Sequence, residues 1–227
     1  MSRTLKIVAV TVMLVGSVAL ADPVTTTVSV GADAFVRDGW QYPDRNYSAG
    51  TTFTINAPSY ERQAYLRFDV SGLIPAGRQV TSAYLRVYSA ATVSSFNCGL
   101  YGLADGATGD AAPGSGGWVE SGITYNNAPS ATVSLGTFAV SGYGSHYFGW
   151  PTGDTALVNF LNADTNGLVT FRLTSDSSTD AVFNSREATG SGAAYLSITT
   201  EAVPEPATMS LLGAGAVLGL LRSRRSK

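Results

Sequence analysis

The sequence predicts an all-β fold, a jelly-roll β-sandwich with one short helix. The first observation is that apolar and polar residues alternate over residues 24–30, 63–70, 83–88 and 169–174. Successive side chains of a strand point to opposite faces, so each of these segments is expected to bury one face and expose the other. The second observation is that Gly, Pro, Asn and Asp separate the segments. Many short strands, turn signals and a single helix together indicate a sandwich.

The remaining segments fit the same architecture. A helix is expected after Asp154, a residue suited to the N-cap, because Leu157, Phe160 and Leu161 then fall on one face. Residues 102–117 are rich in Gly, Ala, Asp and Pro and are expected to form a surface loop. Shorter strands are expected at residues 52–55, 98–103, 133–140, 146–150, 181–184 and 194–199.

Composition and charge exclude several classes of protein. The 227 residues include one cysteine and one histidine, which excludes a disulfide framework and a zinc site built from several Cys or His. Residues 22–203 contain eight Arg, no Lys and fifteen acidic residues. This excess of negative charge repels phosphate backbones, so nucleic acid is not expected as a partner.

The N-terminal segment has the pattern of a secretory signal peptide. Arg3 and Lys6 precede a largely apolar stretch at residues 7–18, and an Ala-Leu-Ala sequence ends at Ala21. Small residues in this arrangement predict cleavage between Ala21 and Asp22, and therefore export. The alternative is an uncleaved anchor, for which the apolar stretch is short.

The C-terminal segment has three parts in a fixed order. Pro204, Glu205 and Pro206 are followed by an uncharged stretch at residues 207–221 and then by a basic tail. This order resembles the PEP-CTERM sorting signal, although a plain single-span anchor is the alternative. The resemblance implies a bacterial envelope, cleavage by a sorting protease of the exosortase type, and transient anchoring in the inner membrane before release to the cell surface or extracellular matrix. The chain then divides into a signal peptide (1–21), an exported domain (22–202) and a sorting segment (203–227).

The exported domain carries a second series of motifs. In chain order they are ADAFVRDG at 32–39, RQAYLRFDVSGL at 62–73, VTSAYLRVY at 80–88, WVE at 118–120, ITYNNAP at 123–129, FNSRE at 183–187 and AYLSI at 194–198. The series resembles the DNRLRE domain, which is similar to a group of carbohydrate-binding modules that includes alginate-binding modules. The resemblance implies a β-sandwich whose partner is an extracellular polysaccharide.

Arginine and tyrosine recur on the polar face of three expected strands. If these strands neighbour one another in one sheet, they form a groove for an acidic sugar. Sugar C–H faces would stack on the rings, and uronate carboxylates would take bidentate bonds from the guanidinium groups. The alternative is that the arginines form ion pairs on an outer sheet face. The candidate residues are Arg67, Arg86, Arg172, Tyr65, Tyr84 and Tyr88.

Two further residues are candidates for the rim of the binding site. Arg37 lies near a strand end, and Trp40 lies in the loop that follows, where an exposed ring could stack on a sugar. Trp118 and Trp150 flank expected strands and are expected in the core.

Asp33, Asp38 and Glu187 are candidate calcium ligands. Calcium needs several oxygen atoms, and backbone carbonyls of adjoining loops could complete its shell. The resemblance also implies such a site, since jelly-roll sugar-binding modules often carry a structural ion. One structural calcium ion is the only cofactor expected.

Three functions are compatible with the residues. The first is a non-catalytic module that binds acidic polysaccharide outside the cell. The second is a small polysaccharide lyase or glycosidase, but nothing in the spacing of the glutamates places two carboxylates together. No nucleophile elbow accompanies His146, so a Ser-His-Asp hydrolase is not expected. The third is a purely structural protein of the biofilm matrix.

Overall fold

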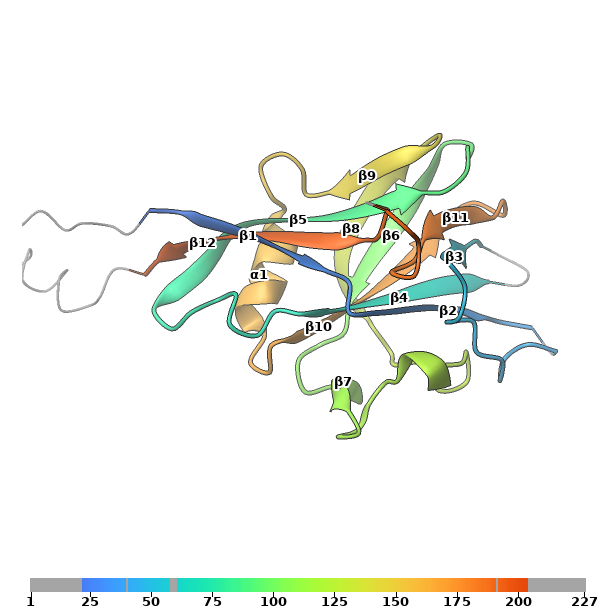
Figure 1. The fold of residues 1–227 in the computed structure, drawn as a ribbon, viewed down its shortest axis with the longest axis horizontal. Coiled ribbons are helices and arrows are strands. Elements are labelled where there is room, and N and C mark those ends of the chain that lie inside the picture. The colour runs from blue at the N-terminus through green and yellow to red at the C-terminus, as the bar shows by residue number, and fades with distance from the viewer. Residues whose placement is uncertain (1–21, 40, 58–60, 191, 204–227) are drawn as a thin grey trace, which may run out of the picture. The chain divides into compact units, whose positions relative to one another are not determined.

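The exported part of the chain forms a β-sandwich. The computed structural model describes residues 22–39, 41–57, 61–190 and 192–203, and residues 22–203 form one compact unit. Two antiparallel sheets face each other across a shared apolar core (Figure 1). The predicted fold class is therefore confirmed. The expected signal peptide, Trp40 and the expected sorting segment from Pro204 onward lie outside the described residues.

The first sheet, here called sheet A, is organised around one long strand, β5. The β12 strand pairs with one edge of β5, and β1 pairs with the far edge of β12. Arg86 of β5 is opposite both Tyr195 of β12 and Tyr147 of β9, so β9 pairs with the other edge of β5. The strands of sheet A are β1 (Val24–Ser29), β12 (Tyr195–Ala202), β5 (Arg78–Ser89), β9 (Gly144–Phe148), β11 (Ala181–Asn184) and β3 (Thr52–Ile55).

The second sheet, sheet B, has five strands in the order β2-β4-β10-β6-β8. Successive strands from β1 to β6 alternate between the two sheets, as expected for a jelly roll. The strands of sheet B are β2 (Ala32–Arg37), β4 (Arg62–Asp69), β10 (Leu168–Ser175), β6 (Phe96–Gly102) and β8 (Val133–Val140).

The period-two segments supply the main core between the sheets. Phe68 of β4 and Phe171 of β10 are fully buried, with ring centroids 5.8 Å apart. Leu85 and Val87 of β5 point into the same core from sheet A. Burial of these apolar side chains is the main favourable term in the folding of the domain.

The single α-helix, α1 (Thr155–Ala163), begins where the sequence predicts. The Asp154 side chain caps it by accepting hydrogen bonds from the backbone N–H groups of Ala156 and Leu157. Leu157 is buried, and the Asn162 side chain bonds both the N–H and the carbonyl of Val80 at 2.8 and 2.9 Å. The helix is thereby fixed to the start of β5. Among the described residues, no helix is long and apolar enough to cross a membrane.

A long segment between β6 and β8 forms a second core on the outer face of sheet B. It contains β7 (Gly109–Pro113) and the short 3-10 helix η1 (Glu120–Gly122). Residues 104–117 lie mostly at the surface, as predicted for residues 102–117, but the segment also includes the short strand β7. Trp118 is 6% exposed and its indole N–H donates to the Thr170 hydroxyl at 3.0 Å. A Cβ at Gly117 would lie 1.8 Å from the Ala111 carbonyl oxygen, so only glycine permits this close approach.

The main core makes a prediction about stability. Leu85→Ala should lower the free energy of unfolding by about 2–5 kcal/mol, because Leu85 is 1% exposed and truncation leaves a cavity. Thr81→Ala on the same strand is exposed and should change it by less than about 0.5 kcal/mol. Denaturant unfolding followed by circular dichroism measures both, and equal effects would contradict the assigned orientation of β5.

Candidate functional site

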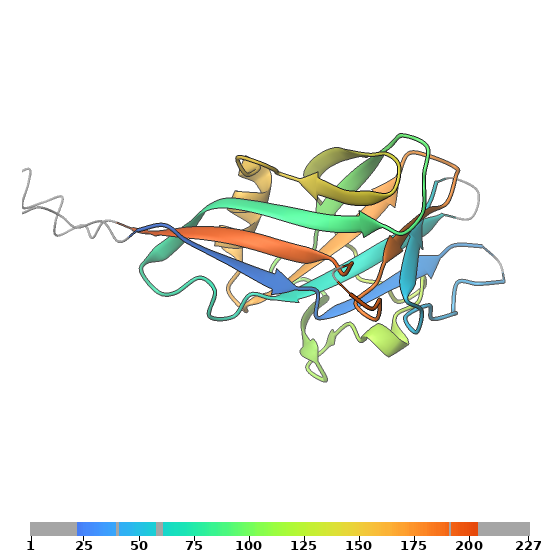
Figure 2. The ribbon, with the colours of Figure 1, turned by 45° about the horizontal axis from the view of Figure 1, so that its top comes forward.

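Strand β5 presents a tyrosine–arginine row on the outer face of sheet A. Leu85 and Val87 point inward, so the pleat turns Tyr84, Arg86 and Tyr88 outward. Strands β12, β5 and β9 lie side by side (Figure 2). Tyr195 of β12 and Tyr147 of β9 contact the Tyr84 ring on the same face. The register therefore gathers these aromatic rings around Arg86.

Four rings form an aromatic cluster centred on Tyr84. The centroid of Tyr84 lies 4.8 Å from Trp150, 6.0 Å from Tyr147 and 6.1 Å from Tyr195. Trp150 is 57% exposed and Tyr147 is 38% exposed. Large aromatic rings left open to water in a cluster are typical of a surface that binds a ligand.

Arg86 lies between this cluster and Tyr88 and is itself only 7% exposed. Its Nε donates to the Ser145 hydroxyl at 3.0 Å and its Nη1 donates to the Ala193 carbonyl at 3.3 Å. The guanidinium carbon lies 5.0 Å from the ring centroid of Tyr88 and 5.3 Å from that of Tyr195. These contacts hold the cation in one position and combine it with aromatic faces.

A hollow of about 440 Å³ opens beside the aromatic cluster. Arg86 contributes its positive charge to the lining, and Tyr147 and Tyr195 belong to both the hollow and the cluster. The lining residues are Ser29, Arg86, Ser145, Tyr147, Gly190, Ala193 and Tyr195. A sugar stacked on the cluster would thus lie next to a polar hollow with a fixed cation.

Two phenols beside Arg86, those of Tyr88 and Tyr195, have raised pKa values. Burial, together with the hydrogen bond to Tyr84, raises the pKa of Tyr195 to about 12. A hydrogen bond with Tyr143 raises the pKa of Tyr88. Both phenols therefore stay protonated, and neutral, in the physiological range.

The three candidate arginines do not share a sheet. Arg86 lies in sheet A, whereas Arg67 on β4 and Arg172 on β10 lie in sheet B. The single arginine-lined groove that the sequence suggested is therefore absent from the described residues. The alternation was predicted correctly, but alternation does not reveal which strands pair.

The outer face of sheet B, where Tyr65 and Arg67 lie, is covered rather than open. Tyr65 is 3% exposed and donates its hydroxyl to the Pro129 carbonyl at 3.1 Å. Arg67 donates to the Trp118 carbonyl at 2.6 Å and lies 4.7 Å from the Trp118 ring centroid. Placing Tyr65 on an exposed binding face was therefore a wrong prediction, because the second core buries it.

The other two arginine candidates also rest on aromatic neighbours. The Arg172 guanidinium lies 4.7 Å from the Tyr101 ring centroid on the outer face of sheet B. The Arg37 guanidinium, at the end of β2, lies 4.1 Å from the Tyr42 ring centroid. Neither belongs to the aromatic cluster of sheet A.

Trp150 was expected in the core, and this prediction was wrong. Phe148 points inward, and strict alternation would send Trp150 inward as well. The chain instead leaves the strand at Gly149, whose φ of 82° turns the backbone. Trp150 consequently reaches the outer face and packs on Tyr84. Trp118, the other tryptophan expected to be buried, lies in the second core.

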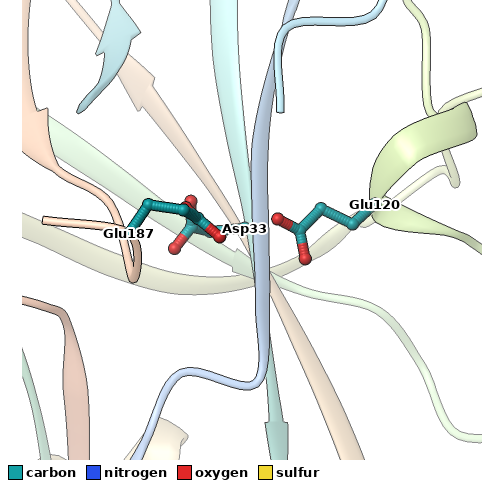
Figure 3. Close-up of side chains that lie close together, drawn as sticks. All are labelled: Asp33, Glu120 and Glu187. Atoms are coloured by element: carbon teal, nitrogen blue, oxygen red, sulfur yellow. The ribbon is translucent and has the colours of Figure 1, made fainter. Parts of the chain in front are cut away.

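Three carboxylates come together at the start of β2, away from the aromatic cluster. One oxygen from each of Asp33, Glu120 and Glu187 lies within 4.8 Å of the others (Figure 3). Two of the three expected calcium ligands therefore meet. Asp38 does not join them, because it follows the opposite end of β2 from Asp33; its carboxylate accepts a hydrogen bond from the Gly39 N–H. No spacing in the sequence points to Glu120, which η1 brings to Asp33 from a distant part of the chain.

Arg186 supplies positive charge to this carboxylate cluster. Its guanidinium forms ion pairs of 3.1 Å with Glu120 and 2.7 Å with Glu187, and its backbone N–H donates to Asp33 Oδ2 at 2.7 Å. Burial, with the nearby Glu187 and Glu120 charges adding to it, raises the pKa of Asp33 to about 7. The oxygens suit calcium, but an ion would have to compete with Arg186. Calcium binding here stays a prediction.

The raised pKa of Asp33 predicts how stability depends on pH. Between its ordinary value of 3.8 and about 7, Asp33 binds more protons in the folded state than in the unfolded state. Stability therefore falls as the pH rises through this window. In the presence of a chelator, the Asp33→Asn variant should lack this decrease in the free energy of unfolding. The decrease in the wild type amounts to about 4 kcal/mol at most. Melting curves at several pH values measure the difference, and a parallel pH dependence in both proteins would contradict it.

Calcium binding is testable on the same pair of proteins. Calcium added after chelation should raise the melting temperature of the wild type, because an ion that binds only the folded state shifts unfolding by mass action. Asp33→Asn removes one anionic ligand and should weaken the shift. An unchanged wild-type melting curve, with no metal found by elemental analysis, would rule the site out.

The two-sheet sandwich is consistent with the fold of a carbohydrate-binding module, and comparison with known families agrees. The sequence model of carbohydrate-binding module family 96 matches residues 24–200, which is nearly all of the described unit. The chain therefore belongs to carbohydrate-binding module family 96. The model of the PEP-CTERM protein-sorting motif matches residues 202–225, so the chain also carries that sorting signal. No curated protein matches the chain.

Proposed function

We propose that this protein is exported to the bacterial surface or extracellular matrix, and that it binds an acidic polysaccharide on the outer face of sheet A. The observation that carries the proposal is the exposed cluster of Tyr84, Tyr147, Trp150 and Tyr195 beside the Arg86 hollow. Family membership supports carbohydrate as the ligand, and the sorting motif supports processing by an exosortase-type protease.

The ring geometry favours a single polysaccharide chain over a flat crystalline surface. Tyr84 is inclined at 81° to Trp150 and at 63° to Tyr147, and Tyr147 is inclined at 36° to Trp150. A flat crystal surface would need rings that lie in one plane, whereas a twisting chain can stack successive C–H faces on rings of different inclination. A soluble polymer is therefore the ligand that fits.

Arg86 supports an acidic sugar rather than a neutral one. A uronate carboxylate that enters the hollow meets a guanidinium whose position is fixed by Ser145 and Ala193. Charge-assisted Arg–carboxylate bonds are stronger than neutral hydrogen bonds and planar in geometry. Because the pocket is partly buried, the attraction is screened less than at an open surface.

Binding without catalysis is the function that the site supports. A glycosidase needs two carboxylates that flank the bound sugar. The residues that line the hollow include none. The three clustered carboxylates lie at the start of β2, where Arg186 bonds each of them.

Binding to polymers tests the proposal. Wild-type protein should bind uronate polymers, and more weakly as salt is added, because the Arg86 contribution is electrostatic. Trp150→Ala should weaken binding by up to roughly tenfold through loss of stacking. Arg86→Lys should remove most of the preference for acidic over neutral polymers, because Lys cannot form the planar fork. Affinity electrophoresis and calorimetry measure both changes.

Tyr101→Ala is the matched control. Tyr101 is a partly exposed aromatic residue on the outer face of sheet B, so its removal should leave binding unchanged. If Tyr101→Ala abolishes binding and Trp150→Ala does not, the site lies on sheet B. If wild-type protein binds no acidic polymer, the proposed ligand is wrong.

A further inference from the structure

Strand β1 leaves one whole edge of sheet A without a partner among the described strands. It pairs only with β12, from Val24 opposite Thr200 to Ser29 opposite Tyr195. The Val30 N–H donates to the Ala194 carbonyl at 3.0 Å and continues the same register. In an antiparallel ladder, residues alternate between those that bond the partner strand and those whose N–H and C=O point away. Thr25, Thr27 and Ser29 therefore direct their backbone groups to the open edge.

The other described edges each carry a feature that discourages pairing. Strand β3 has four residues and β9 has five. Strand β2 contains Asp33 and Arg37 and is bridged to the segment at Tyr47. Strand β8 has a bulge near Gly136. Short length, proline, charge and bulges are the means by which proteins protect sheet edges.

The six residues of strand β1 contain none of these protective features, and Pro23 directly precedes them. The six residues are Val-Thr-Thr-Thr-Val-Ser, without charge, proline, glycine or bulge. Residues of this type favour strands and pair well across them. The strand is also self-complementary, because an antiparallel pair centred on Thr27 places Thr25 opposite Ser29 of a second copy. Such a pair would form about six backbone hydrogen bonds.

We propose that two copies of this protein associate through their β1 edges in an antiparallel pair centred on Thr27. The association joins the two A sheets into one continuous sheet. Adjacent antiparallel strands are related by a two-fold axis perpendicular to the sheet, and that rotation keeps each face on its own side. The outer faces with Trp150 and Arg86 therefore look in the same direction in both copies.

This arrangement produces a two-site surface for a polymer. Figure 2 shows β1 at the margin of sheet A, next to β12 and on the side away from β9. One polysaccharide chain that crosses the pair could contact both aromatic clusters, and the second contact would be intramolecular. The edge contact alone is small, so the pair is expected to be weak in solution and favoured at the high local concentration of a surface or matrix.

Sedimentation velocity of the exported protein, purified from cells that process it, tests the pairing. Over a concentration series that reaches the millimolar range, the wild type should shift from monomer to dimer. Thr27→Pro should stay monomeric with an unchanged melting temperature, because the lost N–H points away from β12 and proline is tolerated at an edge. Thr27→Lys should also stay monomeric, since two like charges would lie opposite each other.

Thr199→Lys is the charge control, because it adds the same charge to the same face one strand away from the edge. It should dimerise as the wild type does. A wild type that remains monomeric, a dimer that persists in Thr27→Lys, or loss of the dimer in Thr199→Lys would overturn the proposal. If Thr27→Pro fails to fold, Thr27→Lys decides.

The dimer rests on the backbone of β1 and not on sugar binding, so the two proposals fail separately. Thr27→Lys should bind a short uronate oligosaccharide as the wild type does, but bind the long polymer roughly tenfold or more weakly. If no sugar binds, the proposed function is wrong and sedimentation still decides the dimer. If the dimer is absent and sugar binds, only the pairing is wrong. Equal polymer binding by a dimeric wild type and a monomeric variant would exclude the two-site surface.

Discussion

The pleat of β5 is the constraint on which the rest of the site depends. Leu85 and Val87 belong to the main core, so Tyr84, Arg86 and Tyr88 must lie on the outer face. Pairing on both edges of β5 then places Tyr195 and Tyr147 on either side of Arg86. A register slip of one residue would move the arginine toward the core, where an unpaired charge is very costly. The same packing that stabilises the sandwich therefore fixes the geometry of the proposed binding face.

The two outer faces use similar residues for different purposes. On sheet B, Tyr65 and Arg67 hold Trp118 and the segment around it, and together they form a second core. On sheet A no comparable segment among the described residues covers Tyr84, and Trp150 remains more than half exposed. Covering one face adds a second buried cluster to the main core, whereas the open face leaves large aromatic side chains exposed. The location of the covering segment thus decides which arginine–tyrosine row belongs to the second core and which lies on the open face that we propose binds sugar.

The local pattern predicts local structure well. Alternation identified β4, β5 and β10, and Asp154 marked the start of α1, because these features depend on neighbouring residues alone. Long-range pairing was not predictable in this way. Nothing in the spacing shows that Arg86 and Arg67 lie in different sheets or that η1 carries Glu120 to Asp33. The position of Trp150 was predicted wrongly because the turn at Gly149 interrupts the alternation of side chains. Without that turn, alternation would place Trp150 on the inner face of sheet A.

The central claim is that polysaccharide binds the outer face of sheet A around Arg86. Amide chemical-shift mapping by NMR during titration with a uronate oligosaccharide tests it most directly. The largest shifts should fall on β5, β9 and the start of β12, near Tyr84, Tyr147 and Tyr195, because these elements frame the aromatic cluster and the hollow. Shifts confined to β2, β4 and the segment around Trp118, with sheet A unchanged, would contradict the claim.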